Sequence, residues 1–559
     1  MKRFALSAIV VALFVAATFG IWRYLIHPGC YWAGHDLRFG LERIAVASRC
    51  IADGQLFPRW AGELYGGYGY PLLHYYPPLF TMIAAWLHLA GLPVLAAMKI
   101  LAGIITGIGA LFTWLWLRPR VSPFAAFAGA FLFATFPYHR IVLTMRGALA
   151  EYLALSMFPA LLWALDRENQ GGAVRWRSAA ALTFAALMLS HNASFLFFVP
   201  GALGYAAVVA WDRGRLRGLI QTGSSLAAGL GLSAFYWVPA FFEKNLVQID
   251  RLLTADNVNF RQHFVSWNDL INPAWPFGGL GPVLLVAALI SPLAILSVRK
   301  RGFGRMAWFL PVAAASYTLL TMKFAQPLWD AFPPLQYVGY PWRLFGAAGL
   351  FAAGSLALVI DAFEQWTGRL PAAAAVLLLT AWLAGTPPLL GHFQLEQFNE
   401  RVLLAESSIR RSTTSTIVAD EYAPLWVKQP PHTVLGIAEQ PAVSQAGATV
   451  VVERSTSREV SLIVDAPSEL QLRLNMIYFP GWEVILNGQP APIRYGNESG
   501  LMEVSVPVGT HQIDVLFYAT PLRFAASALS LTALVIGFVV CLVNLVSRLR
   551  PARQRLGGH

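Results

Sequence analysis

The sequence opens with "MKRFALSAIVVALFVAATFGIWRYLI", residues 1–26, and this stretch decides the class of protein. A basic start is followed by an apolar run that is longer than the core of a secretory signal, and no convincing small-residue cleavage site follows it. We therefore expect an uncleaved membrane span at residues 4–26. The remainder agrees, because 57% of the 559 residues are hydrophobic and only 13% are charged. Apolar runs near spanning length recur, which predicts a polytopic membrane protein.

The distribution of basic residues predicts the topology. A net charge of +12 would indicate nucleic acid as the partner of a soluble domain, but here the Lys and Arg residues lie in short loops between apolar runs, so no nucleic acid is expected. Such loops are cytoplasmic. Placing all of them inside gives about twelve spans with both termini cytoplasmic. The expected spans are residues 4–26, 94–117, 122–138, 150–165, 178–191, 193–211, 219–241, 280–298, 306–322, 343–361, 370–390 and 522–546.

One apolar stretch, residues 77–91, must not cross the membrane if this topology holds. It begins with "YYPPLF", and paired prolines are typical of a helix start rather than of a helix interior. We expect a surface-lying or re-entrant helix at the outer face.

The stretch "HPGCYWAGHDLRFGLERIAVASRC", residues 27–50, follows the first span and concentrates charge. In the expected topology it lies outside, together with most polar residues that have no topogenic role. Arg146 and Glu151, in "TMRGALAEYLALSMF", fall near a span end, and His191 falls in the tight "LSHNAS" turn. Charges near span ends are expensive to dehydrate and so tend to mark function.

The composition changes after residue 390. Residues 391–521 are polar, and from about residue 447 they alternate apolar and polar side chains as half-buried strands do. Asn487-Gly488 is a two-residue hairpin signal. We expect a mainly α-helical transmembrane domain at 1–390 with a first outer loop at 27–93, an extracytoplasmic β-sandwich-like module at 391–521, and a final span with a cytoplasmic tail at 522–559.

Several motifs together resemble one group of bacterial membrane proteins. They are the first-loop acid, "GQLFPRW", "GYGYPLLHYYPPLF", "RGALAEY", "LSHN", "GYPWR" and the terminal "YFPGWEVILNGQ". The group carries the label of 6-pyruvoyl-tetrahydropterin synthase-related membrane proteins, and its layout is similar to that of the GT-C superfamily of polytopic glycosyltransferases. The label itself finds no support in the sequence, because no soluble domain with clustered zinc-binding histidines is visible.

The GT-C resemblance implies transfer of a sugar from a polyprenyl-phosphate donor to a glycan, lipid or protein acceptor. It also implies inversion at the anomeric carbon, and an active face outside the bacterial cytoplasmic membrane. Asp36 matches the first-loop acid that such enzymes use as a base, although here the pattern is His-Asp where many relatives have paired acids. The alternative is that Asp36 only caps a helix beginning at Leu37.

The other candidate residues also have two interpretations. Glu151 either joins Asp36 as a catalytic residue that orients the acceptor or steadies Arg146, or forms a structural pair with that arginine. Arg146 and Arg343 present forked donors suited to a phosphate, or else they snorkel to the interface. The remaining substrate-binding candidates are His35, His191, Trp342 and Tyr76, of which the aromatic pair would stack on sugar or belong to the interfacial belt.

Two further functions and a metal stay open. A flippase or transporter for a lipid-linked glycan should show ionisable groups near the midplane and paired interrupted spans, and neither is visible. A non-catalytic scaffold that binds envelope polysaccharide would not need Arg146 and Glu151 in addition to the first-loop acid. A divalent metal is conceivable among His35, His139 and His191, but no ligand spacing requires it.

Two of the three cysteines, Cys30 and Cys50, fall in the same outer loop. An oxidising exterior permits a disulfide between them, which would hold Asp36 against the membrane face. The alternative is a pair of free, partly buried thiols.

Overall fold

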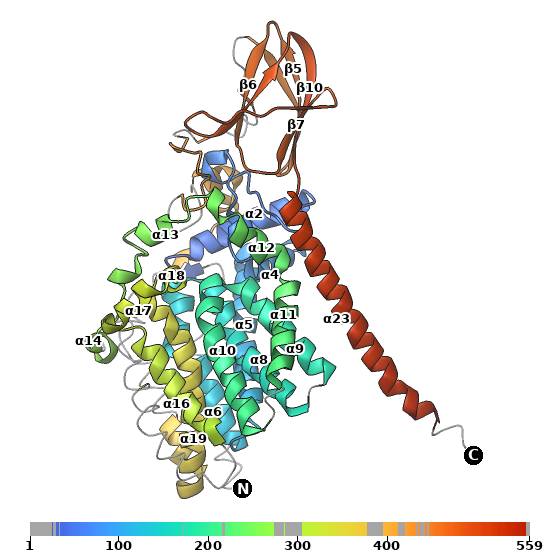
Figure 1. Cartoon of the computed structure of the whole chain (residues 1–559). Helices are drawn as coiled ribbons and strands as arrows, with labels where there is room; N and C mark the ends of the chain where they lie inside the picture. Colours follow the sequence, from blue (N-terminus) through green and yellow to red (C-terminus); the bar gives the residue numbers. More distant parts are fainter. Residues whose placement is uncertain are drawn as a thin grey trace.

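The computed structural model shows a helical bundle with a β module at one end (Figure 1). We call that end of the bundle the module end and the opposite end the far end. The description that follows covers residues 25, 30–32, 34–171, 173–214, 218–272, 284, 304–369, 371–376, 395–411, 420–431, 434–435, 442–443 and 447–554.

The long helices of the bundle are apolar enough to cross a membrane. In the described part of the chain, six stretches qualify, or seven if a pair bent by 76° is counted as one span. The six are Val94–Leu117, Pro123–Arg146, Leu149–Gly171, Asn192–Asp212, Pro341–Thr367 and Pro521–Ser547. They correspond to α5 (Val94–Leu117), α6 (Pro123–Ala134) continued by α7 (Pro137–Arg140) and η2 (Ile141–Arg146), α8 (Leu149–Gly171), α10 (Asn192–Asp212), η7 (Pro341–Leu344) with α19 (Phe345–Thr367), and α23 (Pro521–Gln554).

The expected number of about twelve spans is therefore not confirmed. The predicted spans 4–26, 280–298 and 370–390 lie wholly or almost wholly outside the described residues. Two more predicted spans, 178–191 and 306–322, form helices below the usual spanning length, because α9 (Val174–Ser190) has 17 residues and α16 (Gly304–Leu319) has 16. At 1.5 Å per residue these helices are about 24–26 Å long, somewhat less than a hydrocarbon core of about 30 Å. The predicted span 219–241 is the bent pair, α11 (Gly218–Leu232) and α12 (Ala234–Phe242).

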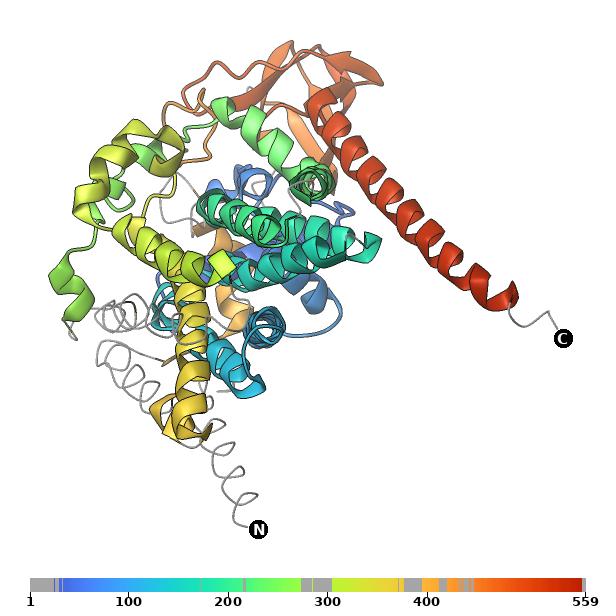
Figure 2. The same ribbon diagram turned by 60° about the horizontal axis from the view of Figure 1, so that its bottom comes forward.

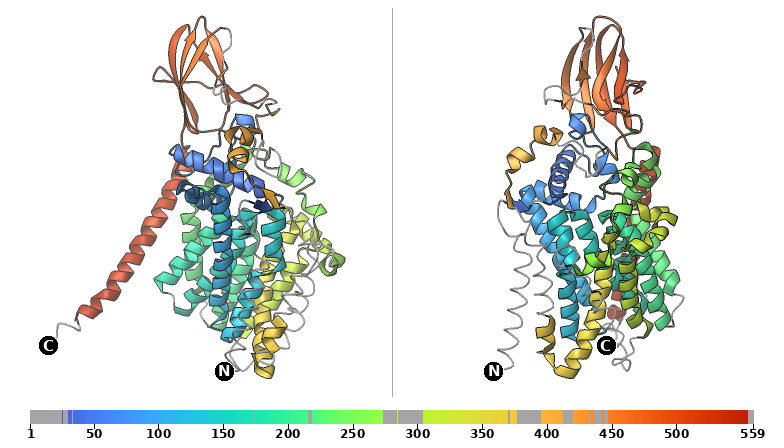
Figure 3. Two further views of the ribbon diagram at one scale, coloured as in Figure 1. Left: turned by 180° about the vertical axis from the view of Figure 1, so that it is seen from behind. Right: turned by 90° about the vertical axis from the view of Figure 1, so that its left-hand side faces the viewer.

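The apolar stretch expected not to cross forms α4 (Leu79–Leu89), which directly follows the two prolines. Its 11 residues make a helix about 16 Å long, too short to span. It packs against α2 (Leu37–Ala52), and α2 lies across the module end of the bundle, beneath the β module (Figure 3). Leu37, Leu41 and Ile44 of α2 are fully buried, and so are most other residues of this helix, which is therefore enclosed on most sides.

The remaining elements connect the bundle to the module. In the first loop, β1 (Cys30–Trp32) pairs antiparallel with β2 (Leu395–Gln397), which follows the bundle in sequence. The short helices are η1 (Tyr65–Gly67), α3 (Leu72–Tyr75), η3 (Lys244–Leu246), α13 (Arg251–Thr254), η4 (Phe260–Gln262), α14 (Trp267–Ile271), η6 (Lys323–Ala325), α17 (Gln326–Ala331), α18 (Pro333–Gln336), α21 (Glu400–Leu403) and α22 (Glu406–Arg411).

The β module consists of two antiparallel sheets. One has the order β4 (Thr449–Ser455), β5 (Glu459–Ala466), β10 (Gly509–Phe517), β7 (Trp482–Leu486), β8 (Gln489–Ala491), and the other β3 (Ala442–Val443), β6 (Leu470–Ile477), β9 (Leu501–Val506). The predicted strands after residue 447 are confirmed. Alternating residues such as Leu462 and Val464 of β5 or Leu472 and Leu474 of β6 are fully buried, and they form the core of the module.

The hairpin between β7 and β8 has the predicted two-residue loop. Leu486 pairs with Gln489, and Asn487 and Gly488 have φ angles of 49° and 81°. Both values are left-handed, as a type I′ turn requires.

We expect Gly488→Ala to lower the free energy of unfolding of the module by about 1–2 kcal/mol through backbone strain. Nothing lies within 4 Å of the site where the new Cβ would sit, so steric contact does not contribute. Thermal unfolding of the purified chain measures the effect, and Asn487→Gly, which relieves the same conformation, should cause no loss. An unchanged melting temperature in Gly488→Ala would contradict the turn assignment.

The module is joined to the first loop by aromatic packing and by a buried polar cluster. Trp60 contacts Phe479, Trp482 and Phe517 of the module, with ring centroids 5.8–6.1 Å apart. Beside it, His74 Nε2 lies 2.7 Å from Glu243 Oε2, and Arg523 Nε donates to the same oxygen at 3.0 Å. His74 Nδ1 lies 3.2 Å from Arg59 Nη1, so a neutral imidazole accepts from the arginine and donates to the carboxylate.

Acid should weaken this buried cluster. Burial lowers the pKa of His74 from 6.5 to about 4, against the attraction of Glu243, and the pKa of Glu243 is also lowered by His74 and Arg523. Between pH 6.5 and 4, His74 is therefore protonated in the unfolded chain but stays neutral in the folded chain. Stability falls as the pH falls, by up to about 1.4 kcal/mol per pH unit for His74. Thermal unfolding between pH 7 and pH 4 should show this slope in the wild type and a flatter one in His74→Gln.

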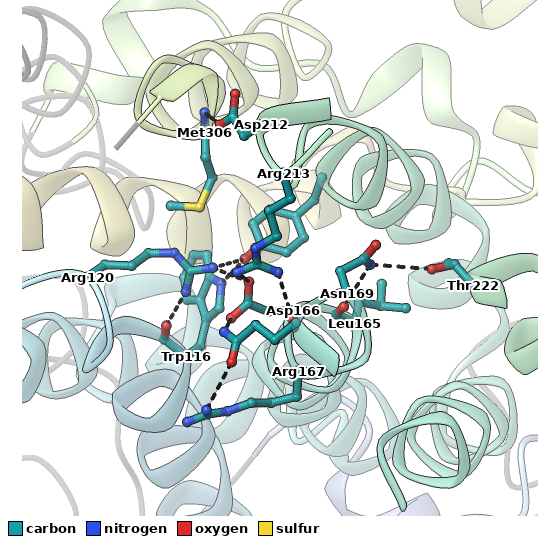
Figure 4. A network of polar contacts seen from close by, with 12 residues as sticks. Trp116, Arg120, Leu165, Asp166, Arg167, Asn169, Asp212, Arg213, Thr222 and Met306 are labelled. Atoms are coloured by element: carbon teal, nitrogen blue, oxygen red, sulfur yellow. Dashed lines mark hydrogen bonds and ion pairs between the residues drawn. The ribbon is translucent and has the colours of Figure 1, made fainter. Parts of the chain in front are cut away.

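The far end of the bundle holds a separate ion-pair network (Figure 4). Asp166 of α8 is buried and receives hydrogen bonds from Arg120 and, at 3.0 Å, from Arg213. Arg120 also donates to the Tyr205 hydroxyl at 3.0 Å, and Gln170 donates to the second carboxylate oxygen at 2.9 Å. These contacts bind the loops that follow α5 and α10 to the end of α8.

Candidate active site

Glu151, in the first turn of α8, is the centre of a buried polar cluster at the module end. The Tyr138 hydroxyl donates to Oε1 at 2.5 Å. Arg146 donates to Oε2, and the Nε of Arg343 lies 3.3 Å from that oxygen. Glu151 is fully buried, and Arg146 is 4% exposed. Both carboxylate oxygens are thus engaged, and one carboxylate holds two guanidinium groups side by side.

The backbone brings Asp36 to this cluster. Gly147, with φ 65°, ends η2, and a Cβ there would lie 2.6 Å from the Leu37 Cβ. The start of α2 therefore packs directly on this turn. The amide of Asp36 donates to the Arg146 carbonyl at 2.7 Å, and the amide of His35 donates to the Met145 carbonyl at 3.2 Å.

The Asp36 carboxylate is not used as a helix cap. The residue occupies the N-cap position of α2, but its side chain makes no capping hydrogen bond, and its buried Oδ1 has no partner in the described structure. Burial raises the pKa of Asp36 above 3.8, although the nearby positive charges of Arg146, Arg43 and Arg343 oppose the shift. The side chain is thus a carboxylate beside several cations with one oxygen uncommitted.

Aromatic rings cover the two arginines. Trp342 stacks on Tyr340 with centroids 4.6 Å apart, and the Arg146 guanidinium lies 4.8 Å from the Trp342 centroid. The Arg343 guanidinium lies 4.9 Å from the Tyr340 centroid. Such cation–π contacts fix the guanidinium planes. The predicted residues Asp36, Arg146, Glu151, Arg343 and Trp342 therefore come together in one site.

Three residues of the site were not predicted. The guanidinium of Arg43 lies 4.1 Å from the ring centroid of the predicted residue Tyr76. Arg43 follows Asp36 by seven residues, or two helical turns, and this spacing could have indicated that the two share a helix face. Tyr340 lies within the "GYPWR" motif that pointed to Trp342 and Arg343. Tyr138 comes from the turn before Arg146, and no spacing in the sequence indicated that its hydroxyl would reach Glu151.

A family model described as "6-pyruvoyl-tetrahydropterin synthase related domain; membrane protein" matches residues 73–388. The matched segment is more than half of the chain. The chain belongs to this family of membrane proteins.

One curated relative of this 6-pyruvoyl-tetrahydropterin synthase-related protein is an uncharacterized protein of Lactococcus lactis subsp. cremoris (strain MG1363). It is 23% identical over 282 residues, which make up 48% of the chain and 44% of the relative. The chain therefore spans less than half the length of the curated relative that it matches.

Three solved structures are similar to the family member described here. The arabinofuranosyltransferase AftD from Mycobacteria has a TM-score of 0.45 and 18% identity, with 70% of this chain and 27% of that one covered. ArnT from Cupriavidus metallidurans bound to undecaprenyl phosphate has a TM-score of 0.40 and 14% identity, with 68% and 77% covered. The Archaeoglobus fulgidus oligosaccharyltransferase has a TM-score of 0.43 and 12% identity, with 76% and 60% covered. Overlap at this level does not establish a shared activity.

The histidines of this family member do not converge. His35 is exposed. His191 accepts from the Ser194 amide at 3.2 Å and so caps α10, although it lies close enough to interact electrostatically with Glu151. His139 is buried against Phe133, and neither of its ring nitrogens has a partner in the described structure. Among the described residues no three His, Cys, Asp or Glu side chains form a group that could hold a metal ion.

Of the two states that the sequence leaves open for Cys50, a disulfide and a free thiol, the structure shows a free, buried thiol. Its Sγ lies 3.6 Å from the Trp60 carbonyl oxygen, and burial raises its pKa to about 12. Cys50 sits in the last turns of α2, a 16-residue helix about 24 Å long, whereas Cys30 precedes the start of that helix.

Proposed function

We propose that this protein is an integral membrane glycosyltransferase that moves a sugar from a polyprenyl-phosphate donor to an acceptor hydroxyl, with inversion at the anomeric carbon. The observation that carries the proposal is the uncommitted Oδ1 of Asp36 beside the Arg146–Glu151–Arg343 cluster. A base and a cationic group suited to a phosphate leaving group thus share one site. Both are required for this reaction.

In the proposed step, Asp36 takes the proton of the acceptor hydroxyl. The acceptor oxygen forms a bond to the anomeric carbon while the bond from that carbon to the phosphate oxygen breaks, and the phosphate keeps the electron pair. A raised pKa makes Asp36 a stronger base than an exposed aspartate. Inversion follows because base and leaving group act on opposite faces of the sugar.

Arg146 and Arg343 bind the phosphate in this proposal. The Nη2 of Arg146 is buried without a partner in the described structure, so it is a free donor. Glu151 engages the same guanidinium groups with both oxygens already bonded. It therefore acts as a positioning residue and does not serve as the base. Trp342 and Tyr76 fix Arg146 and Arg43 by cation–π contact.

The sidedness of the site is part of the proposal. We place the module end outside the bacterial cytoplasmic membrane and both termini in the cytoplasm. Arg120 and Arg213 lie at the far end, and the excess of arginine there agrees with a cytoplasmic position. An impermeant thiol reagent applied from outside should label Ala90→Cys but reach Gln170→Cys only after permeabilisation; both positions are exposed. The opposite pattern would invert the topology.

The direct test is to incubate the purified chain with a panel of radiolabelled polyprenyl-phosphate sugars and a mixed glycan, lipid and peptide acceptor pool. We expect release of the polyprenyl phosphate with one donor. Tight binding of an intact lipid-linked glycan without turnover would favour a transporter or flippase. Binding of polysaccharide alone, with no donor bound, would favour a non-catalytic envelope scaffold.

A further inference from the structure

Three aromatic side chains form a cluster where the module meets the segment that leads into it. Tyr478 stacks on Tyr495 with centroids 4.1 Å apart and ring planes 11° apart. Trp426 leans against both rings, with centroids 5.7 Å and 5.4 Å away. All three side chains are only half-buried. We call Trp426, Tyr478 and Tyr495 the aromatic platform.

The platform is held rigidly by its backbone. Trp426 Nε1 donates to the Tyr478 carbonyl at 3.0 Å, and the Tyr478 amide donates to the Gly500 carbonyl at 2.9 Å. Gly500 has φ 66°, and a Cβ there would lie 2.8 Å from Trp426 Cδ1, so only glycine lets the indole reach this position. Aromatic rings that are fixed before a ligand arrives lose little entropy on binding.

Exposed polar residues flank the platform residues in the sequence. The segments that carry Trp426 and Tyr495 also carry the exposed side chains of Lys428, Arg494 and Glu498. An aromatic face with hydrogen-bonding groups at its edge complements a sugar ring, which has an apolar C–H face and a rim of hydroxyls. A lipid tail has no groups that could form hydrogen bonds with such polar side chains.

An aromatic path joins the platform to the candidate active site. Tyr422, four residues before Trp426, stacks on Tyr75 with centroids 5.3 Å apart. The next residue, Tyr76, lies under Arg43 and is close enough to Asp36 for the two to interact electrostatically. Four residues of chain reach at most about 14 Å, so Trp426 lies within about that distance of Tyr422, and the pair Tyr75–Tyr76 continues the path to the site.

We infer that the aromatic platform binds a distal sugar of an oligosaccharide acceptor whose terminal hydroxyl lies at Asp36. The inference rests on the proposed function and narrows its acceptor from a glycan, lipid or protein to a glycan several residues long. Tyr422, Tyr75 and Tyr76 lie between the platform and Asp36, so a glycan that contacts both must be several sugars long. A short acceptor fills the site without reaching Trp426.

The test measures glycan binding separately from turnover. The full chain in lipid nanodiscs is titrated with fluorescently labelled linear hexasaccharides of glucan, mannan, galactan and arabinan. We expect at least one to bind, and Trp426→Ala and Tyr495→Ala to weaken its binding by about tenfold, the value of one lost aromatic stacking contact. Trp426→Phe, which keeps a ring, should retain most of the affinity. The matched control is Tyr518→Ala, because Tyr518 is an exposed tyrosine of the same module outside the platform.

Each outcome decides one of the two proposals. If no hexasaccharide binds, if binding survives both alanine variants, or if only peptides bind at the platform, the inference is wrong. A second outcome is that hexasaccharide binding depends on the platform residues and is retained in Asp36→Asn, while the wild type turns over no donor. In that case the inference about the platform is supported and the glycosyltransferase proposal is wrong. With an active donor, the platform variants should raise KM for hexasaccharide acceptors and leave KM for disaccharides unchanged.

Discussion

Asp36→Asn should reduce transfer from the active donor by about 10²–10⁴-fold, the usual contribution of a positioned general base. The amide has nearly the same shape, and the carboxylate makes no capping hydrogen bond that the change would break. Folding should therefore be unaffected. Single-turnover release of polyprenyl phosphate measures the loss, and donor binding should remain.

The matched control is Asp53→Asn at the other end of α2. Asp53 accepts a hydrogen bond from the Ser457 amide at 2.7 Å, and an asparagine oxygen can accept the same bond. Turnover in Asp53→Asn should stay near the wild-type rate. Full activity in Asp36→Asn, with activity lost in a module variant such as Glu483→Gln, would place the active site elsewhere.

Glu151→Gln should lower the free energy of unfolding by about 3–5 kcal/mol, because the buried Arg146 and the partly buried Arg343 would lose the carboxylate that neutralises them. The effect is large because Glu151 is fully buried and is bonded through both oxygens. Thermal unfolding in detergent or nanodiscs gives the shift in melting temperature.

A surface pair provides the comparison. Glu459 and Arg454 lie 3.3 Å apart on the module with the arginine side chain 62% exposed, and Glu459→Gln should change stability by less than about 1 kcal/mol. A double variant, Glu151→Gln with Arg146→Gln, should be less destabilised than the sum of the two single changes. Equal and small effects at both glutamates would show that the buried cluster is not an ion-pair network.

The elements predicted best are those decided by local pattern. The span predicted at 94–117 is α5, and the Asn487-Gly488 turn joins β7 to β8, since apolar length and turn chemistry are local properties of the chain. The polar residues near span ends also converged, because burying a charge there requires partners. What local pattern could not supply was the partner itself. Tyr138 reaches Glu151 only because the turn at Gly147 reverses the chain.

Other features of the structure depend on three-dimensional geometry, which the spacing of residues in the sequence does not encode. Cys30 and Cys50 share a loop, but their spacing does not show whether they pair, and Cys50 is a free, buried thiol. The interpretation of Asp36 as a cap was reasonable for its position, and only the side-chain geometry shows that the carboxylate is uncommitted. The platform residues Trp426 and Tyr495 are far apart in sequence and meet only after the module has folded.

Helix α23 lies along the outside of the bundle and diverges from it toward its end, as Figures 1 and 2 show, and none of its most apolar window is buried inside the protein. Its contacts with the bundle lie on one side, against α12, α11 and α9, and include Ser530 Oγ with the Phe235 amide at 2.8 Å and Cys541 with Ser178 at 3.2 Å. Selection on most of this helix therefore acts on the hydrophobicity of its side chains and hardly on how they pack against the protein. Among homologues, its residues should exchange freely within the apolar set and diverge faster than α8 or α19, even though it is the most hydrophobic of the six candidate spans.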